Sequence, residues 1–171
     1  AVIVPIWRKA HQKDSVLEAA ERIRAELAGQ FRVKMDDREG LTPGWKFNEW
    51  ELRGVPLRIE IGPRDVEKES VVFARRDIPG REGKTFVPMA GLAAAVGEML
   101  DTIQANMLAE ATAFRDANIH EAKEYDGLKE IVGNGWAKAY WCGDDACEAK
   151  IKEDTKATSR NIPLDQGDAG P

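Results

Sequence analysis

The chain has 171 residues, of which 43% are hydrophobic and 32% charged, and its formal net charge is −5. This composition is that of an ordinary globular protein, which excludes collagen-like, low-complexity and wholly disordered chains. The acidic balance disfavours a protein that coats duplex DNA, because such binding needs a strongly basic face. No apolar run approaches the ~20 residues of a membrane span, and we expect no signal peptide.

The ends of the sequence and its cysteines bear on what kind of protein it comes from. There is no initiator methionine, and the last residues read as part of a loop, so we expect a piece of a larger protein. Two cysteines, Cys142 and Cys147, are too few for the disulfide framework of a secreted domain. A reduced, cytoplasmic protein is therefore expected.

Hydrophobic patterning predicts an α/β domain in the first two thirds of the chain. A β-branched run at 2–7 precedes apolar residues at helical spacing between Val16 and Leu27, and a short alternating strand follows at 31–35. This β-α-β opening implies a right-handed crossover and a parallel strand pair. The later elements are a short helix at 45–52, strands at 55–61, 70–76 and 84–89, and a long helix at 90–117 with an apolar stripe from Leu92 to Ala111.

The pattern changes after about residue 118. A helix is predicted at 119–132, and mixed strand and helix signals surround the cysteines, with a lysine- and glutamate-rich run that fits a solvated helix face. We therefore expect two domains. Residues 1–117 would form a mixed five-stranded sheet flanked by three helices, and residues 118–171 a small α/β appendage.

The most informative segment for function is TPGWKFNEWELRGVPLRIEIGPRDVE, residues 42–67. Phe47 and Glu51 are four residues apart and so share a face of the predicted short helix. Arg58 projects from one face of the following strand. Arg64 and Asp65 follow the end of that strand, and open α/β sheets tend to bind ligands at the carboxyl ends of their strands.

An aromatic ring, a carboxylate and an arginine can together hold an unpaired base. The ring stacks on the base, the carboxylate accepts its N–H groups, and the arginine donates to its acceptors, a set that suits guanine. The alternative is purely structural. Phe47 and Trp50 would then be core residues, and Glu51 and Arg58 a surface ion pair worth ~0–1 kcal/mol.

A family resemblance favours the base-binding interpretation. The string PGWKFNEWELRGVPLRIEIGPRDVE resembles the anticodon-binding domain of prolyl-tRNA synthetases of the archaeal/eukaryote-like type. Further matches are VPIW near the start, IQANMLAEA in the long helix and WCGDDACEAKIKEDTKATSRNIP near the end, so the resemblance covers essentially the whole chain.

The resemblance implies that this domain reads the two guanines shared by proline anticodons. Phe47 would stack on a base, Glu51 and Arg58 would bind guanine edges, and Asp65 would lie near the same pocket. From charge and location, three basic residues are weaker candidates for phosphate contacts: Lys46, Arg64 and Arg75. No catalytic residue is expected in this chain, because nothing in it matches the parts of the family that bind ATP and proline.

The cysteines are open to several interpretations. Two thiolates in C-x4-C spacing do not complete a structural zinc site, which takes four ligands. The resemblance implies that Cys142 and Cys147 supply half of a four-cysteine zinc site, whose second pair would lie beyond Pro171. The alternatives are a member that has lost zinc, or a disulfide in an oxidised sample.

The implied parent enzyme is a homodimeric proline–tRNA ligase, which uses ATP and Mg in a separate catalytic domain and binds the tRNA for proline. Two competing hypotheses remain. The same fold serves as a non-enzymatic binding module, as in accessory subunits of mitochondrial DNA polymerase, and the chain could instead be a stand-alone metal-binding regulator. No membrane or duplex DNA partner is expected.

Overall fold

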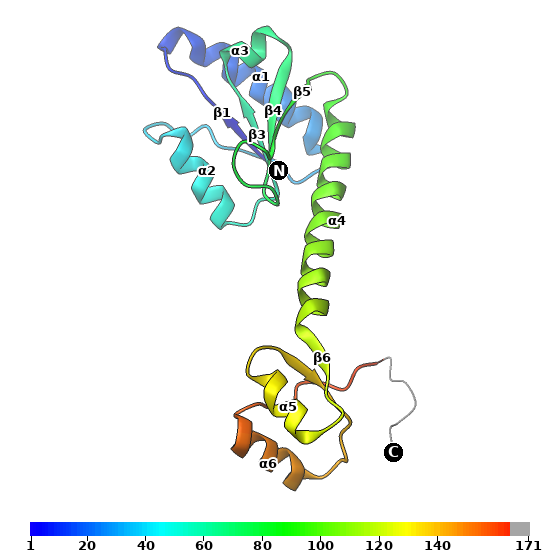
Figure 1. Cartoon of the computed structure of the whole chain (residues 1–171). Coiled ribbons are helices and arrows are strands. Elements are labelled where there is room, and N and C mark those ends of the chain that lie inside the picture. The colour runs from blue at the N-terminus through cyan, green and yellow to red at the C-terminus, as the bar shows by residue number, and fades with distance from the viewer. Residues whose placement is uncertain (165–171) are drawn as a thin grey trace. The chain divides into compact units, whose positions relative to one another are not determined.

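The computed structural model describes residues 1–164 and divides the chain into two compact units, Ala1–Leu108 and Ala109–Pro171. The first unit contains a five-stranded sheet and the second a two-stranded one (Figure 1). None of the helices in residues 1–164 combines the length and apolar character of a membrane span.

The sheet of the first unit is mixed, in the strand order β2-β1-β3-β4-β5. The central strand pairs and the parallel β1–β2 pair confirm the predicted fold class. β1 runs parallel to both of its neighbours, whereas β4 is antiparallel to β3 and to β5. The strands are β1 (Val2–Pro5), β2 (Lys34–Met35), β3 (Leu57–Ile61), β4 (Ser70–Arg75) and β5 (Lys84–Pro88).

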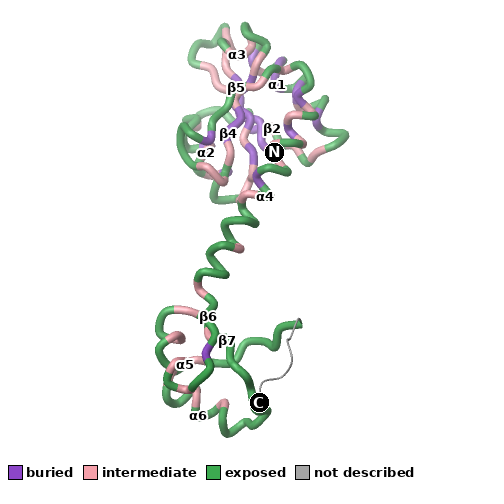
Figure 2. The backbone as a smooth tube through the Cα atoms, turned by 45° about the vertical axis from the view of Figure 1, so that its right-hand side comes forward, coloured by how far each residue is buried: buried purple, intermediate pink, exposed green. Residues whose placement is uncertain are grey.

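One face of this sheet carries the hydrophobic core. Alternate side chains of β1, β3 and β4 point to this face, where α1 (Ala10–Ala28) and the first half of α4 (Leu92–Asn118) cover them. Figure 2 shows the buried residues gathered at the sheet. The core consists of Ile3, Val16, Ala19, Ala20, Ile23, Leu27, Leu57, Ile59, Ile61, Val71, Phe73, Leu92, Val96 and Ile103.

The apolar stripe predicted for the long helix is confirmed only over its first half. Leu92, Val96 and Ile103 are buried, but Met107 is 42% exposed and Leu108 is 63% exposed. The predicted stripe to Ala111 was therefore too long, because Ile103 is the last residue of the helix that belongs to the core.

Two short helices flank the ends of β3. α2 (Pro43–Leu52) begins at Thr42, whose hydroxyl accepts a hydrogen bond from the Trp45 N–H, and proline occupies its first turn. α3 (Pro63–Glu67) was not expected from the sequence. The Asp65 carboxylate caps it by accepting from the Gly62 N–H at 2.8 Å.

The second unit contains a two-stranded parallel sheet and two helices. Its elements are β6 (Ile119–Glu121), α5 (Tyr125–Val132), β7 (Trp136–Lys138) and α6 (Asp145–Thr155). The helix predicted at 119–132 was wrong over its first residues, because Ile119–Glu121 pairs with β7 instead. Among its described residues only Ala122 is buried, so this unit has little core of its own.

Candidate nucleic-acid interface

The second face of the five-stranded sheet carries the candidate site. Two rows of side chains cross this face from strand to strand: Val2, Arg58, Ala74 and Lys84 form one row, and Val4, Glu60, Val72 and Phe86 form the other. α2 lies over the β1 end of both rows, where Trp50 packs against Val2 and Val4. The rows are therefore apolar and buried at β1 and become charged and exposed toward β5.

The α2 helix is held by a buried carboxylate. Asp36, which follows β2, accepts hydrogen bonds from Arg38 Nε and Nη2 at 2.8 Å and from the Trp50 indole at 2.7 Å. The bonds from Arg38 hold the pKa of the Asp36 carboxyl well below its usual range. Sequence analysis did not single out this residue.

Lys46 belongs to the same network. Its ammonium donates to the Asp36 carbonyl at 2.9 Å and lies 3.8 Å from the Asp36 carboxylate, and its side chain is only 5% exposed. A buried ammonium with these partners is directed into the protein and not toward solvent. We therefore correct its expected position on the outer surface, where it would have met a phosphate.

Three of the expected base-binding residues meet where α2 lies against β3. Arg58 Nη1 donates to Glu51 Oε1 at 3.0 Å, and its guanidinium lies 3.9 Å from the centre of the Phe47 ring. Arg58 Nε donates to Glu60 Oε1 at 3.0 Å, and Lys84 donates to the other Glu60 oxygen at 2.7 Å. We call Phe47, Glu51, Arg58, Glu60 and Lys84 the arginine cluster.

The two acidic residues of the arginine cluster differ in exposure. The Glu51 side chain is 56% exposed, whereas that of Glu60 is 10% exposed and paired on both oxygens. Glu60 therefore orients Arg58 and Lys84, while Glu51 can present an oxygen to a ligand. Sequence analysis missed the roles of Glu60 and Lys84, although the strand alternation that placed Arg58 outward also places Glu60 there.

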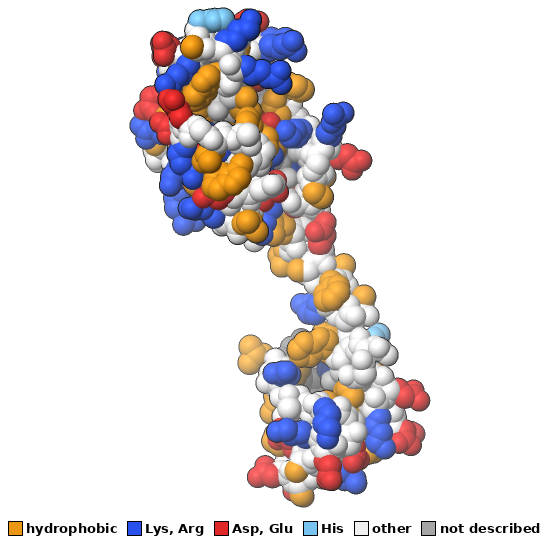
Figure 3. Space-filling view, turned by 90° about the vertical axis from the view of Figure 1, so that its left-hand side faces the viewer, with side chains coloured by type: hydrophobic (Ala, Val, Ile, Leu, Met, Phe, Trp, Pro, Cys, Tyr) orange, Lys and Arg blue, Asp and Glu red, His pale blue; other side chains and the backbone are white. Residues whose placement is uncertain are grey.

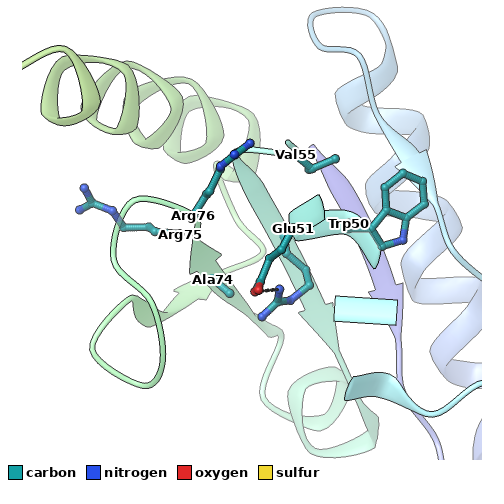
Figure 4. Close-up of a pocket in the computed structure, with 7 residues that line it drawn as sticks. Trp50, Glu51, Val55, Ala74, Arg75 and Arg76 are labelled. Atoms are coloured by element: carbon teal, nitrogen blue, oxygen red, sulfur yellow. Dashed lines mark hydrogen bonds and ion pairs between the residues drawn. The ribbon is translucent and has the colours of Figure 1, made fainter. Parts of the chain in front are cut away.

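The hollow beside the arginine cluster is shallow. Its volume is about 10 Å³, and it is lined by Trp50, Glu51, Val55, Arg58, Ala74, Arg75 and Arg76 (Figure 4). Typical small-molecule pockets hold ~300–1,000 Å³. A base must therefore lie over this surface, and the Phe47 ring, which Arg58 covers, can stack on a base only after the guanidinium shifts.

Arg75, the last residue of β4, and Arg76, which follows it, point in different directions (Figure 4). Arg75 pairs with Asp77 through two hydrogen bonds, and Asn106 of α4 donates to the same carboxylate, so Arg75 is held toward the core face and away from Arg58. The Arg75 guanidinium holds the pKa of Asp77 below its usual range. Figure 4 shows the Arg75 head group directed away from Glu51, so a phosphate contact by Arg75, which stays a prediction, would lie away from Glu51.

Arg76 is a residue that sequence analysis did not single out. It is exposed, lines the same hollow, and has no acidic partner among residues 1–164. Its Nη1 lies so close over Gly54 that a Cβ there would sit 2.7 Å from it, and Gly54 has a φ of 76°. This arginine is better placed than Arg75 to meet a phosphate at the cluster.

Asp65 and Arg64 lie at the other end of β3. Arg58 is the second residue of the strand, whereas Asp65 follows its carboxyl end, so the length of the strand separates them. The expectation that Asp65 shares a pocket with Arg58 is therefore not met. Asp65 Oδ2 caps α3, no described residue bonds to Oδ1, and Arg64 is exposed in the same turn.

A larger cavity of about 330 Å³ opens at this carboxyl end of the sheet. It is lined by Ile6 and Trp7 after β1 and by the loop that leads into α2. Arg38 and Lys46 also line it, but both are paired with Asp36. Ile6 adjoins the end of β3, because its N–H donates to the Ile61 carbonyl at 2.8 Å.

The cysteines of the second unit do not form a metal site by themselves. Cys142 and Cys147 are exposed free thiols, and a hydrogen bond with Cys142 raises the pKa of Cys147. No group of three or more His, Cys, Asp or Glu side chains able to hold a metal ion occurs in residues 1–164. These residues therefore supply at most two of the four ligands of a structural zinc site.

Comparison with known families agrees with the geometry. Residues 1–99 match the family model described as Anticodon binding domain, and residues 125–171 match the one described as Prolyl-tRNA synthetase, C-terminal. The proline–tRNA ligase of Roseiflexus castenholzii is 52% identical over 165 residues, which are 96% of this chain and 34% of that protein.

Two further relatives are equally extensive matches. The proline–tRNA ligase of Chloroflexus aurantiacus is 50% identical over 96% of this chain and 34% of its own length. The chloroplastic/mitochondrial proline–tRNA ligase of Arabidopsis thaliana is 49% identical over 96% of this chain and 31% of its own length. The chain thus spans about a third of the length of these relatives, and it belongs to the anticodon binding domain family in the form carried by proline–tRNA ligases.

Proposed function

We propose that the arginine cluster binds an unpaired guanine of a tRNA anticodon. The observation that carries this proposal is the contact of Arg58, whose side chain is 11% exposed, with the exposed carboxylate of Glu51 and with the ring of Phe47. Arg58 Nη2 has no partner among the described residues and can donate to guanine O6, while the free oxygen of Glu51 accepts from N1–H and N2–H.

This arrangement discriminates against the other purine. Adenine presents an amino group where guanine has O6, and an unprotonated N1 where guanine has N1–H. Adenine would therefore oppose donor to donor at Arg58 and acceptor to acceptor at Glu51. Each well-made bidentate contact to a base is worth about 1–3 kcal/mol of discrimination.

Asp65 is retained as a candidate for a second nucleotide. It lies at the carboxyl end of β3, where strand ends of open α/β sheets commonly bind ligands, and Oδ1 is free of described partners. The 330 Å³ cavity next to Ile6 lies at the same edge. Two guanines, unstacked and held at opposite ends of β3, would account for both groups of residues, and Arg64 would then lie near the backbone of the second.

The parent protein would be a proline–tRNA ligase, which activates proline with ATP and Mg in a catalytic domain and esterifies it to tRNA. In this proposal residues 1–117 bind the anticodon and residues 118–171 form a small C-terminal domain. The names and lengths of the relatives support it, since each is a proline–tRNA ligase about three times as long as this chain. A homodimeric, cytoplasmic parent is part of the same proposal.

The direct test is a titration of the 171-residue chain with RNA hairpins that carry a proline anticodon. We expect binding to weaken roughly tenfold or more when both guanines are replaced by adenine, at one fixed salt concentration. A duplex DNA of equal charge serves as the control for non-specific attraction. Equal affinity for the two hairpins would refute the proposal, and tighter binding of the duplex would favour an accessory-subunit type of module.

A further inference from the structure

The outer half of the α2-facing sheet surface is left uncovered by the fold. Burial decreases along the row Val4, Glu60, Val72 and Phe86, from 0% exposure at Val4 and 7% at Glu60 to 73% at Phe86. The α2 helix packs on Val4 of this row, and its Phe47 ring contacts Arg58 of β3 and, at 5.2 Å, the Lys84 ammonium of β5 in the other row. Phe86 is therefore a large ring that stands on an open sheet surface and that folding does not use.

We propose that Phe86 is a stacking platform for a nucleotide next to the guanine held by the arginine cluster. This inference rests on the proposed anticodon-binding function and adds a second, sequence-tolerant contact to it. Open β-sheet surfaces with exposed aromatic rings bind single-stranded RNA by stacking on unpaired bases, and every base offers a face for such a contact.

The spacing and the charges of the surface fit this occupant. Phe86 is one strand beyond Val72 and two strands beyond Glu60, so it lies about 10 Å from the Glu60 position across the sheet. Neighbouring bases can span such a distance once they are unstacked. Lys84 precedes it by two residues on the same face of β5, and Arg58 occupies the same cross-strand row as Lys84.

Basic groups lie on the same face of the sheet as the ring, with Lys84 two residues before it on β5 and Arg76 after the end of β4. Figure 3 views the side of the first unit that carries α2, where apolar side chains lie next to lysines and arginines. Lys84 is 34% exposed, and Arg76 at the adjacent hollow lacks an acidic partner among residues 1–164. An apolar ring beside cationic groups favours a polyanion that carries aromatic bases over an apolar protein surface.

The test compares four variants of the full chain on a hairpin with the proline anticodon. Phe86→Ala and Phe86→Leu should each bind about tenfold more weakly than the unmodified chain. Phe86→Tyr keeps a ring and should bind as tightly as the unmodified chain. Phe114→Ala is the matched control, because this α4 ring is 71% exposed and lies outside the sheet, and it should leave binding unchanged. The fluorescence of 2-aminopurine placed beside the guanines of the hairpin should decrease more on binding the unmodified chain than on binding Phe86→Ala.

The outcomes separate this inference from the function on which it rests. If Phe86→Ala and the parent bind equally, and both prefer guanine to adenine, the platform is refuted and the anticodon function stands. The platform is also refuted if Phe86→Leu binds as well as the parent, since an apolar contact would then suffice. If the parent itself shows no preference for guanine, the anticodon function and the platform fail together.

Discussion

The two faces of the five-stranded sheet differ in what they do for the molecule. On the core face, α1 and α4 cover a continuous set of apolar side chains, among which Ile59 and Phe73 are fully buried. On the opposite face, α2 covers β1 and the near side of β3, and leaves charged and aromatic side chains exposed. The first face supplies most of the hydrophobic core, whereas the second combines a smaller buried cluster with side chains that remain exposed.

This difference separates structural from functional roles among similar residues. Arg75 and Arg58 come from adjacent strands, but Arg75 faces the core side and is clamped by Asp77, while Arg58 faces the open side. Lys46 and Lys84 differ in the same way, since Lys46 is buried and Lys84 is exposed. Charge alone therefore does not distinguish these residues, whereas the face of the sheet and the partners of each side chain do.

The largest expected effect comes from truncating the same residue type on each face. Phe73→Ala should lower the free energy of unfolding of the first unit by about 3–5 kcal/mol, because it leaves a cavity in the core. Phe86→Ala should change it by no more than about 0.5 kcal/mol, because the ring is exposed. Urea unfolding followed by tryptophan fluorescence measures both, and comparable losses would mean that the outer face is covered in solution.

The second prediction concerns the buried network that fixes α2. Asp36→Asn should destabilise the first unit by about 3 kcal/mol, because it leaves the buried Lys46 ammonium without its negative partner. The matched control is Glu39→Gln, which breaks the exposed pair with Lys13 and should change stability little.

The same network predicts a specific pH dependence. Because the folded pKa of Asp36 is below the unfolded value of about 3.9, the unfolded state binds more protons in this range. The contribution of Asp36 is therefore present above pH ~4 and is lost as the pH falls toward the folded pKa. The free energy of unfolding should therefore depend less on pH between pH 2 and 6 for Asp36→Asn than for the unmodified chain. An equal dependence on pH in the two proteins would contradict this assignment.

The main elements could be predicted from the sequence because their signals are local. Strand alternation and helical spacing specified the sheet, α1 and most of α4, and the β-α-β opening specified the parallel pair. The prediction failed where the structure of a segment depends on pairing with a distant strand, or on how far the core that a helix covers extends. Ile119–Glu121 became a strand through its pairing with β7, and the stripe of α4 ended at Ile103 because the core ends there.

The candidate site was predicted only in part for a similar reason. The face shared by Phe47 and Glu51 follows from helical spacing, and the outward direction of Arg58 follows from alternation. The resemblance implied that Asp65 lies near the pocket of Arg58, but Arg58 is the second residue of β3 and Asp65 follows its carboxyl end. The buried role of Lys46 depends on Asp36, ten residues away, and no local pattern reveals that pair.

The third prediction tests whether the open face reads a base or only attracts RNA. Arg58→Lys keeps the charge but loses the planar fork of donors, so it should reduce the preference for guanine over adenine hairpins about tenfold. Its overall affinity for the adenine hairpin should stay close to that of the parent, since the charge is retained. Competition binding with the two hairpins measures the ratio, and an unchanged ratio would show that Arg58 acts through charge alone.

The smallest expected effect is that of Arg76, which we assign to the RNA backbone. Arg76→Ala should weaken binding to guanine and adenine hairpins by the same factor, and the slope of log K against log salt should become less steep by about 0.7. Arg24→Ala removes the same charge from α1, on the covered side of the sheet, and should leave the slope unchanged. If both variants lower the slope equally, the RNA responds to net charge, and the two faces do not differ in their contact with nucleic acid.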